Sequence, residues 1–180
     1  MTIQKTKIEG VLEIQPKIHS DERGWFHRVF DKSSLQEVIT KPIVQINHSF
    51  NKVRGTFRGF HFQKAPYAES KLIRCIQGKV YDMALDLRKE SETFLQVVAV
   101  ELCAEKRNMI FIPEGCAHGF ITLEDNCELE YYHSEEYQRD FESGFSIFDE
   151  RLEVHLPIEI NVISERDKSF EPLGLNFEGI

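Results

Sequence analysis

Eight short segments of strand-forming residues, each ending at a turn, constrain the fold of this chain more than any other feature. The segments cover residues 43–49, 56–63, 70–76, 79–87, 95–102, 108–112, 118–123 and 127–133. Gly78 and Asn126 fall in two of the predicted tight turns between them. Short strands that recur in this way are typical of an all-β sandwich or barrel. We therefore predict an all-β fold for the centre of the chain.

The segment before these strands predicts an N-terminal arm. Residues 1–18 have the pattern of a strand pair, and residues 25–30 have the aromatic and β-branched composition of a further strand. Residues 31–38 are the best helix candidate, with Ser33 or Ser34 as the N-cap. The arm is thus expected to contain three strands and one helix.

The segment after the strands predicts a C-terminal tail with short helices. The sequence becomes irregular after residue 149, apart from a predicted helix over residues 163–168 that Ser164 would cap. The whole chain is expected to form one domain. We assign residues 1–40 to the arm and first strands, 41–148 to the core, and 149–180 to a tail that closes the site.

Charge and composition argue against several kinds of partner. The 180 residues carry a net charge of −8 and no basic run longer than two residues, so we expect no nucleic-acid partner. No apolar segment approaches the length of a membrane span, and the first residues lack the apolar stretch of a signal peptide. Four cysteines without CxxC spacing are expected to be free thiols of a cytoplasmic protein.

One predicted strand, residues 56–63, carries polar groups of catalytic type among aromatic residues. Side chains alternate between the two faces of a strand, so Arg58 is expected on the same face as Phe60 and Phe62. His61 is expected on the opposite face. A strand with this pattern predicts a wall that packs on one side and lines a cavity on the other.

Residues 113–118 have the form P-x-G-x-x-H, which resembles the second half of a cupin signature. Cupins are double-sheet jelly rolls, and their metal-binding members take further ligands from an HxH pair and a Glu in a first motif. Here the first motif supplies His61 and Gln63, and Lys71 stands where the Glu is expected. An ammonium group has no lone pair for a metal. We therefore predict a cupin-type jelly-roll β-barrel that works without a metal or other cofactor.

A cavity that holds a His, a Lys and a Tyr suits proton abstraction next to a carbonyl group. A neutral His accepts the proton, a Lys stabilises the enolate oxygen, and a Tyr hydroxyl returns a proton from the other face. Such a base needs an orienting carboxylate, and spacing alone leaves Asp82, Asp86 and Asp167 as candidates. The alternative is that His61 and His118 are hydrogen-bonded wall residues without a catalytic role.

A set of short motifs adds a more specific indication. The motifs are Asp21–Phe26, Gln45–Ser49, Gly55–Gln63, Lys71–Arg74, Gln77–Asp82, Asp86–Arg88, Ile112–Pro113, Ala117–Phe120, the pair Tyr131 and Tyr137, and Ser164–Asp167. In this order, and over nearly the whole chain, they resemble the dTDP-4-dehydrorhamnose 3,5-epimerase family.

The resemblance implies roles for matching residues. His61 corresponds to the catalytic base, Asp167 to its carboxylate partner, Tyr131 to the acid on the far face and Lys71 to the cation at the keto oxygen. The residues implied to bind the sugar, the diphosphate and the nucleotide are Arg23, Phe26, Gln45, Asn47, Arg58, His118 and Tyr137. The resemblance also implies a homodimer in which the N-terminal strands extend the partner's sheet.

Arg28 departs from the family pattern, which commonly has a Glu there on the nucleobase side of the site. A carboxylate accepts a hydrogen bond from a thymine N–H, whereas an Arg only donates. Either Arg28 helps to bind a base richer in acceptors, such as cytosine or guanine, or it points to solvent and Gln45 contacts thymine. Tyr132, His133 and Glu136 also differ from the usual residues, although His133 by itself is expected to be structural or exposed.

We therefore predict cofactor-independent epimerisation, at C3, C5 or both, of a nucleotide-linked 4-keto-6-deoxy sugar in deoxysugar and polysaccharide biosynthesis. Two alternatives remain, a 3,4-ketoisomerase of such sugars on a related barrel and a non-catalytic sugar-nucleotide-binding module. Tyr131 favours epimerisation, because inversion requires an acid on the far face. A binding module would not need His61 and Asp167 as a pair.

Overall fold

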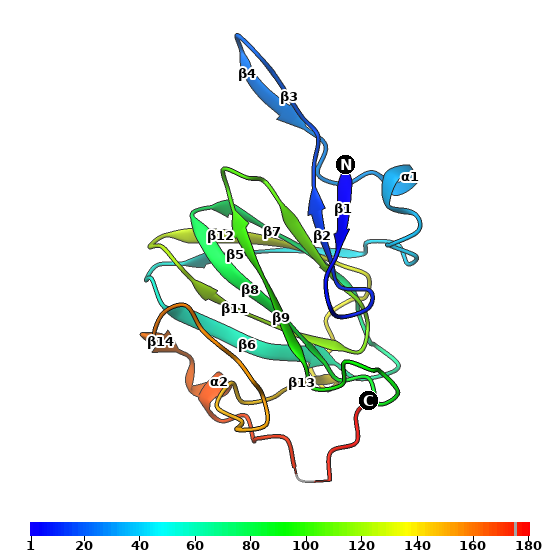
Figure 1. Cartoon of the computed structure of the whole chain (residues 1–180), viewed down its shortest axis with the longest axis vertical. Coiled ribbons are helices and arrows are strands. Elements are labelled where there is room, and N and C mark those ends of the chain that lie inside the picture. The colour runs from blue at the N-terminus through cyan, green and yellow to red at the C-terminus, as the bar shows by residue number, and fades with distance from the viewer. Residues whose placement is uncertain (175) are drawn as a thin grey trace.

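Two β-sheets form most of the molecule in a computed structural model that describes residues 1–174 and 176–180 (Figure 1). The first sheet contains, in spatial order, β1 (Thr2–Lys5), β2 (Leu12–Gln15), β10 (Met109–Ile112), β7 (Lys71–Gln77), β12 (Cys127–His133) and β5 (Gln45–Asn51). The second contains β13 (Glu142–Gly144), β6 (Thr56–Gln63), β11 (Cys116–Thr122), β8 (Lys79–Asp86) and β9 (Val97–Cys103), with β14 (Val162–Ile163) parallel to β6.

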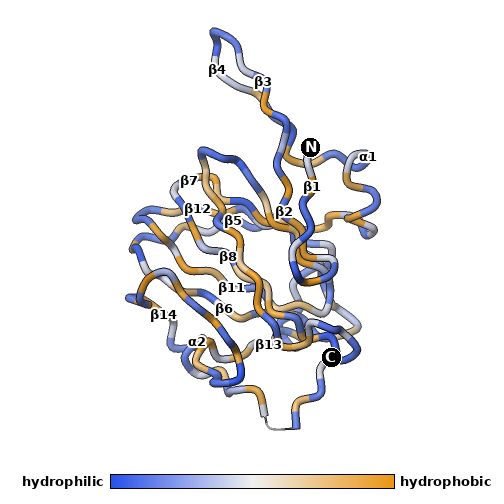
Figure 2. The backbone as a smooth tube through the Cα atoms, in the orientation of Figure 1, coloured by the Kyte–Doolittle hydropathy of each residue, from blue (hydrophilic) through white to orange (hydrophobic). Residues whose placement is uncertain are grey.

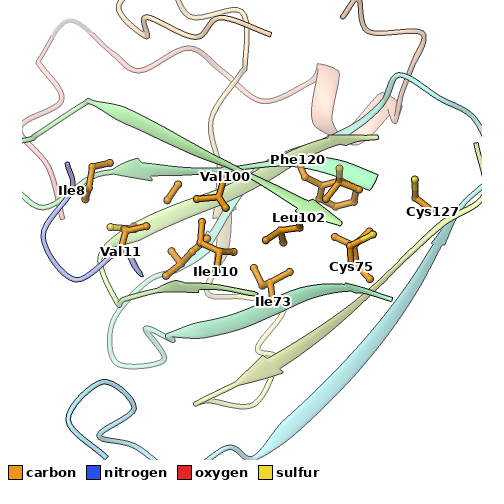
Figure 3. Close-up of a cluster of buried hydrophobic side chains, with 14 residues drawn as sticks. Ile8, Val11, Ile73, Cys75, Val100, Leu102, Ile110, Phe120 and Cys127 are labelled. Carbon is orange, nitrogen blue, oxygen red and sulfur yellow. The ribbon is translucent and has the colours of Figure 1, made fainter. Parts of the chain in front are cut away.

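The two sheets pack face to face over an apolar core. Ile73 and Ile110 enter this core from the first sheet, and Val100, Leu102 and Phe120 enter it from the second (Figure 3). The sheets do not close into a barrel. The predicted jelly roll is therefore present as an open sandwich, and the predicted barrel closure is wrong because β1 and β5 remain at the edges of the first sheet.

The outer face of each sheet has its own apolar cover. Leu35 and Ile39, from the segment between β4 and β5, pack with Leu72 and Phe111 of the first sheet. Leu152 and Leu173 of the C-terminal tail, with Ile147 just before it, pack with Phe57, Phe60 and Phe62 of β6 in the second sheet. Hydrophobic residues accordingly concentrate along the strands of the two sheets (Figure 2).

A hairpin of β3 (Ile18–Asp21) and β4 (Gly24–His27) forms a separate two-stranded sheet and projects away from the sandwich (Figure 1). Its tip is hydrophilic (Figure 2). Two large apolar side chains of the hairpin, Trp25 and Phe26, are 57% and 65% exposed. The hairpin thus presents apolar surface of which more than half is exposed in this chain.

The eight strands predicted over residues 43–133 are all present, with ends shifted by at most two residues. The strand pair predicted at the N-terminus is present as β1 and β2. The strand predicted over residues 25–30 is shorter and is displaced to β4.

The predicted helices are present but short. The first, α1 (Lys32–Leu35), has Asp31 as its N-cap, because the extended Asp31 places its carboxylate 3.0 Å from the Ser34 backbone N–H. The prediction of Ser33 or Ser34 as the cap is therefore wrong. The tail contains α2 (Glu165–Lys168), and Ser164 caps it as predicted. No further helix of the tail is found in the part that the structure describes.

Candidate active site

A polar cavity of about 560 Å³ lies between the two sheets, next to their apolar core. Strands β5, β6, β7, β11 and β12 contribute its walls. Among the side chains that line it are seven that the sequence predicts as site residues: Asn47, Arg58, His61, Lys71, His118, Tyr131 and Tyr137. The fold therefore brings together residues that lie far apart in the sequence.

A β-bulge on β6 places both Arg58 and His61 at the cavity. His118 of β11 pairs with His61, and Phe120 pairs with Arg58, so two steps along β11 correspond to three along β6. The prediction that Arg58 shares a face with the neighbouring aromatic residues is wrong. Those residues pack in the outer apolar cluster, while Arg58 lines the cavity.

Gly59 is required at this bulge. Its φ of +139° lies in the region that favours glycine, and a Cβ added there would stand 2.5 Å from the Gly119 Cα. The close approach of β6 and β11 thus depends on the absence of a side chain, and it sets the position of His61.

His61 is hydrogen-bonded to a buried carboxylate. Its Nε2 lies 2.9 Å from Asp167 Oδ1, and the Gly59 backbone N–H donates to the other carboxylate oxygen at 3.2 Å. Asp167 belongs to α2 and donates its backbone N–H to Ser164 Oγ. Burial raises the pKa of Asp167, but the hydrogen bond and charge of His61, with the Gly59 N–H, outweigh burial and hold that pKa below its ordinary value.

The other two candidate carboxylates have different partners. Asp82 is fully buried, and both of its oxygens lie 3.0 Å from His118 Nε2. Burial raises the pKa of Asp82 and lowers the pKa of His118, which favours the uncharged form of each group. Asp86 pairs with Arg88. Asp167 is thus the one of the three that can orient His61.

Tyr131 and Lys71 lie in the same cavity as His61. The Tyr131 hydroxyl is 2.9 Å from Ser49 Oγ. Burial raises the pKa of this phenol, so it remains protonated near neutral pH. The Lys71 ammonium is 3.1 Å from Glu69 Oε1, and both side chains are largely buried.

The cavity also holds groups suited to a polar ligand. Arg58 Nε donates to Asn51 Oδ1 at 2.8 Å. The Tyr137 hydroxyl donates to Glu142 at 2.6 Å, and Arg166 forms an ion pair with the same carboxylate. The pKa of Glu142 is raised by burial, but these two partners outweigh burial and lower it.

Four predicted binding residues are not among those that line this cavity. Arg23 pairs with Asp21 at the tip of the hairpin, and Phe26 lies on β4. Arg28 follows β4 and pairs with Asp31 at 2.9 Å, with 64% of its side chain exposed. Gln45 does not line the cavity either, but it accepts a hydrogen bond from the backbone N–H of Tyr137, which does.

Several cavity residues were not predicted from the sequence. Ser49, Glu69, Glu142 and Arg166 line it, and so does His133, which was expected to be structural or exposed. Two features of the sequence indicate some of these residues. Residues two apart on a strand share a face, as Tyr131 and His133 do. Glu69 and Arg166 are close in sequence to predicted site residues.

Neither a metal site nor a reactive thiol is evident in the described residues. No group of three or more His, Cys, Asp or Glu side chains there is arranged to hold a metal ion. The four cysteines are free and buried. Burial raises the pKa of Cys75 and of Cys116 to about 12, so neither thiol ionises near neutral pH. No helix of the described chain is long and apolar enough to cross a membrane.

Two jelly-roll sheets with a polar cavity between them define the chain as a cupin-type protein. A sequence profile described as dTDP-4-dehydrorhamnose 3,5-epimerase matches residues 5–174. The chain therefore belongs to the dTDP-4-dehydrorhamnose 3,5-epimerase family. The enzyme of that name from Shigella flexneri is 39% identical over 169 residues, which span 93% of this chain and 93% of that protein.

Solved structures agree with this assignment. The dTDP-4-dehydrorhamnose 3,5-epimerase from Bacillus anthracis, with TDP and PPi bound, superposes with a TM-score of 0.92 at 35% identity, covering 96% of this chain and 99% of that one. The dTDP-6-deoxy-D-glucose-3,5-epimerase from Legionella pneumophila, in complex with dTDP-4-keto-L-rhamnose, gives 0.91 at 34% identity, covering 97% and 94%.

Proposed function

We propose that this protein epimerises a nucleotide-linked 4-keto-6-deoxy sugar at C3, C5 or both, without a cofactor. The observation that supports this proposal best is the hydrogen-bonded pair of His61 and Asp167 in one cavity with Tyr131 and Lys71. Membership of the family, whose Legionella member was solved with a dTDP-4-keto sugar, supports the substrate class.

His61 acts as the base. Since its Nε2 donates to Asp167, its Nδ1 carries the lone pair that accepts the proton. The carbon–hydrogen bond next to the keto group breaks, its electrons form the enolate, and the Lys71 ammonium stabilises the enolate oxygen. Asp167 holds the imidazole in the required tautomer and stabilises the imidazolium that forms.

Tyr131 acts as the acid. Its hydroxyl gives a proton to the opposite face of the same carbon while the enolate returns to the ketone, so the configuration inverts. The raised pKa of Tyr131 suits this role, because the phenol is protonated when the enolate forms. His61 then releases its proton to solvent, and Tyr131 takes one up.

The remaining predicted residues bind the substrate. Arg58 and His118 contact the sugar and the diphosphate, for which a guanidinium offers paired donors. Asn47, Gln45 and Tyr137 lie toward the nucleotide side. If Arg28 contacts the base, the substrate carries a base richer in acceptors than thymine. If Arg28 faces solvent, the substrate carries dTDP. A thermal-shift panel of dTDP, CDP, GDP and UDP separates these outcomes, since a ligand that binds the folded state raises its stability.

The active form is a homodimer in which the hairpin of one protomer extends the other protomer's sheet and brings Arg23, Phe26 and Arg28 to its cavity. This accounts for the exposed apolar residues of the hairpin and for the open edge strand β5, where Ile46 and Phe50 are 62% and 53% exposed. The protein is expected in the cytoplasm, in keeping with its free cysteines.

Solvent deuterium exchange tests the reaction. In deuterium oxide, the protein should introduce deuterium at C3, C5 or both of a dTDP-linked 4-keto-6-deoxy sugar. NMR of the product separates epimerisation from a shift of the keto group between C3 and C4. Undiminished exchange by His61→Asn would remove His61 as the base, and binding without any exchange would indicate a non-catalytic module.

A further inference from the structure

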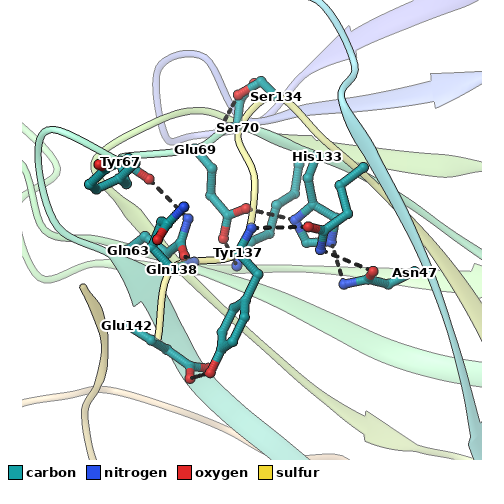
Figure 4. A network of polar contacts seen from close by, with 12 residues as sticks. Asn47, Gln63, Tyr67, Glu69, Ser70, His133, Ser134, Tyr137, Gln138 and Glu142 are labelled. Atoms are coloured by element: carbon teal, nitrogen blue, oxygen red, sulfur yellow. Dashed lines mark hydrogen bonds and ion pairs between the residues drawn. The ribbon is translucent and has the colours of Figure 1, made fainter. Parts of the chain in front are cut away.

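A chain of hydrogen bonds that includes Glu69, His133 and Asn47 runs along the cavity wall (Figure 4). Strand pairing sets its course, because His133 on β12 stands opposite Lys71 on β7 and opposite Gln45 on β5. Cross-strand partners project to the same face of a sheet. Glu69, which precedes β7, completes the group at the buried end.

The buried end of the chain is a carboxylate with two different partners. Glu69 Oε1 is 3.1 Å from the Lys71 ammonium, and Glu69 Oε2 is 2.7 Å from His133 Nδ1. No more than 10% of any of these three side chains is exposed. Burial raises the pKa of Glu69, but Lys71 and the hydrogen bond from His133 outweigh burial and lower it, so the carboxylate is charged.

The outer end of the chain fixes the direction of its hydrogen bonds. The Tyr137 backbone N–H donates to Gln45 Oε1 at 3.0 Å, which turns the Gln45 amide NH₂ toward Asn47 Oδ1, also at 3.0 Å. Asn47 must then present its own NH₂ to His133 Nε2, at 3.2 Å. His133 Nε2 is therefore an acceptor, and the imidazole proton lies on Nδ1, where it is donated to Glu69.

We propose that His133, acting through Glu69, is a positioning residue for the Lys71 ammonium. By donating to one oxygen of Glu69, His133 leaves only the other oxygen for Lys71 and so fixes where the ammonium points in the cavity. Without that donor, both carboxylate oxygens become available to Lys71, which draws the ammonium toward Glu69 and away from the substrate oxygen. This role rests on the proposed function of Lys71.

Two substitutions at position 133 separate positioning from packing. His133→Phe keeps a ring but removes the donor, whereas His133→Asn keeps an N–H at the place of Nδ1. The deuterium-exchange kcat of His133→Phe should fall roughly 10- to 100-fold, the range expected for a misplaced catalytic group, with KM changed little. His133→Asn should recover most of that loss. An unchanged kcat for His133→Phe, or no recovery with Asn, would overturn the proposal.

Glu69→Gln provides a second variant in case His133→Phe does not fold. It keeps the size of the side chain and removes the charge that holds Lys71, so its kcat should also fall while KM changes little; an unchanged kcat would count against the proposal. His155→Asn serves as the matched control, because His155 is exposed on the tail outside the cavity. Circular dichroism and thermal midpoints verify that each variant is folded.

Imidazole ¹⁵N NMR of the unliganded wild-type protein tests the hydrogen-bond chain without any substrate. His133, identified by the signal that His133→Asn removes, should show a protonated Nδ1 and an unprotonated Nε2. The opposite tautomer would contradict the chain. A wild-type protein that exchanges no deuterium would refute the proposed function, whereas normal exchange with an unaffected His133→Phe would refute only the positioning role.

Discussion

The cavity and the β3–β4 hairpin both hold predicted site residues, but they organise them differently. In the cavity, His61, Lys71 and Tyr131 each have a hydrogen-bond or ion-pair partner that lies in the same chain and is at least partly buried. On the hairpin, Arg23 is 85% exposed along its side chain and pairs, among the residues that the structure describes, only with Asp21, two residues away. The groups for proton transfer therefore have their partners within one chain, whereas Arg23 and Phe26 of the hairpin are largely exposed.

The largest expected effect lies in the cavity. His61→Asn should lower the rate of deuterium exchange by about 10²- to 10⁴-fold, the usual contribution of a general base. Binding should persist, because the groups proposed to bind the nucleotide are unchanged. The measurement is NMR exchange together with a thermal shift on adding dTDP. Loss of the thermal shift would instead assign His61 to binding.

A substitution on the hairpin should weaken substrate binding more than it slows the chemical step. Arg23→Ala is expected to raise KM roughly 10- to 100-fold with a smaller change in kcat, because a charge-assisted hydrogen bond contributes about 1.5–3 kcal/mol. Steady-state kinetics measures both constants. A fall in kcat at constant KM would indicate that Arg23 acts in the chemical step.

Mixing the two variants tests which cavity the hairpin serves. If the hairpin completes the partner's site, a mixed dimer of His61→Asn and Arg23→Ala contains one cavity with both native residues. Refolding the variants together should then restore part of the activity that each lacks at low substrate concentration. Activity that stays at the sum of the separate variants would place the hairpin over its own cavity.

A pair of matched aspartates compares the hairpin with the second sheet in terms of stability. Asp86 and Asp21 each pair with an Arg two residues later, but Asp86 is buried and Asp21 is exposed. Burial raises the pKa of Asp86, but hydrogen bonds from Arg88, Ser91 and Thr93 outweigh it and bring the pKa to about 2. Its stabilising effect is therefore complete above the ordinary pKa near 3.8 and disappears as the pH falls toward 2.

Urea unfolding at neutral pH should show the difference. Asp86→Asn is expected to lower the free energy of unfolding by about 2 kcal/mol, and that loss should shrink below pH 3.8. Asp21→Asn should leave the unfolding midpoint unchanged. Equal effects of the two substitutions would show that burial of the carboxylate does not determine its contribution to the free energy of unfolding.

The smallest effect is expected for the thiols. Because Cys75 and Cys116 have pKa values of about 12 and are buried, iodoacetamide at pH 8 should not modify them in the folded protein. Peptide mapping should find neither residue alkylated, and activity should stay unchanged. Rapid alkylation at either residue would indicate that the sandwich opens locally.

Structural features that depend on residues adjacent in the chain are predicted correctly from the sequence. Alternating β-forming residues and Gly or Asn turns locate the eight central strands within two residues, and the family resemblance identifies seven of the residues that line the cavity. The face of Arg58 is mispredicted because the bulge depends on how β6 pairs with β11. Glu69 and His133 are missed because their contact comes from the register of two strands, which a single sequence does not reveal.

The position of Asp167 makes proton transfer sensitive to a small part of the molecule. This partner of His61 lies 106 residues away in sequence, on a helix of four residues that follows a strand of two. Opening of this short segment would separate the pair while both sheets stay folded, since segments with few contacts open at low cost in free energy. On heating, exchange activity should therefore be lost at a lower temperature than the β-sheet signal.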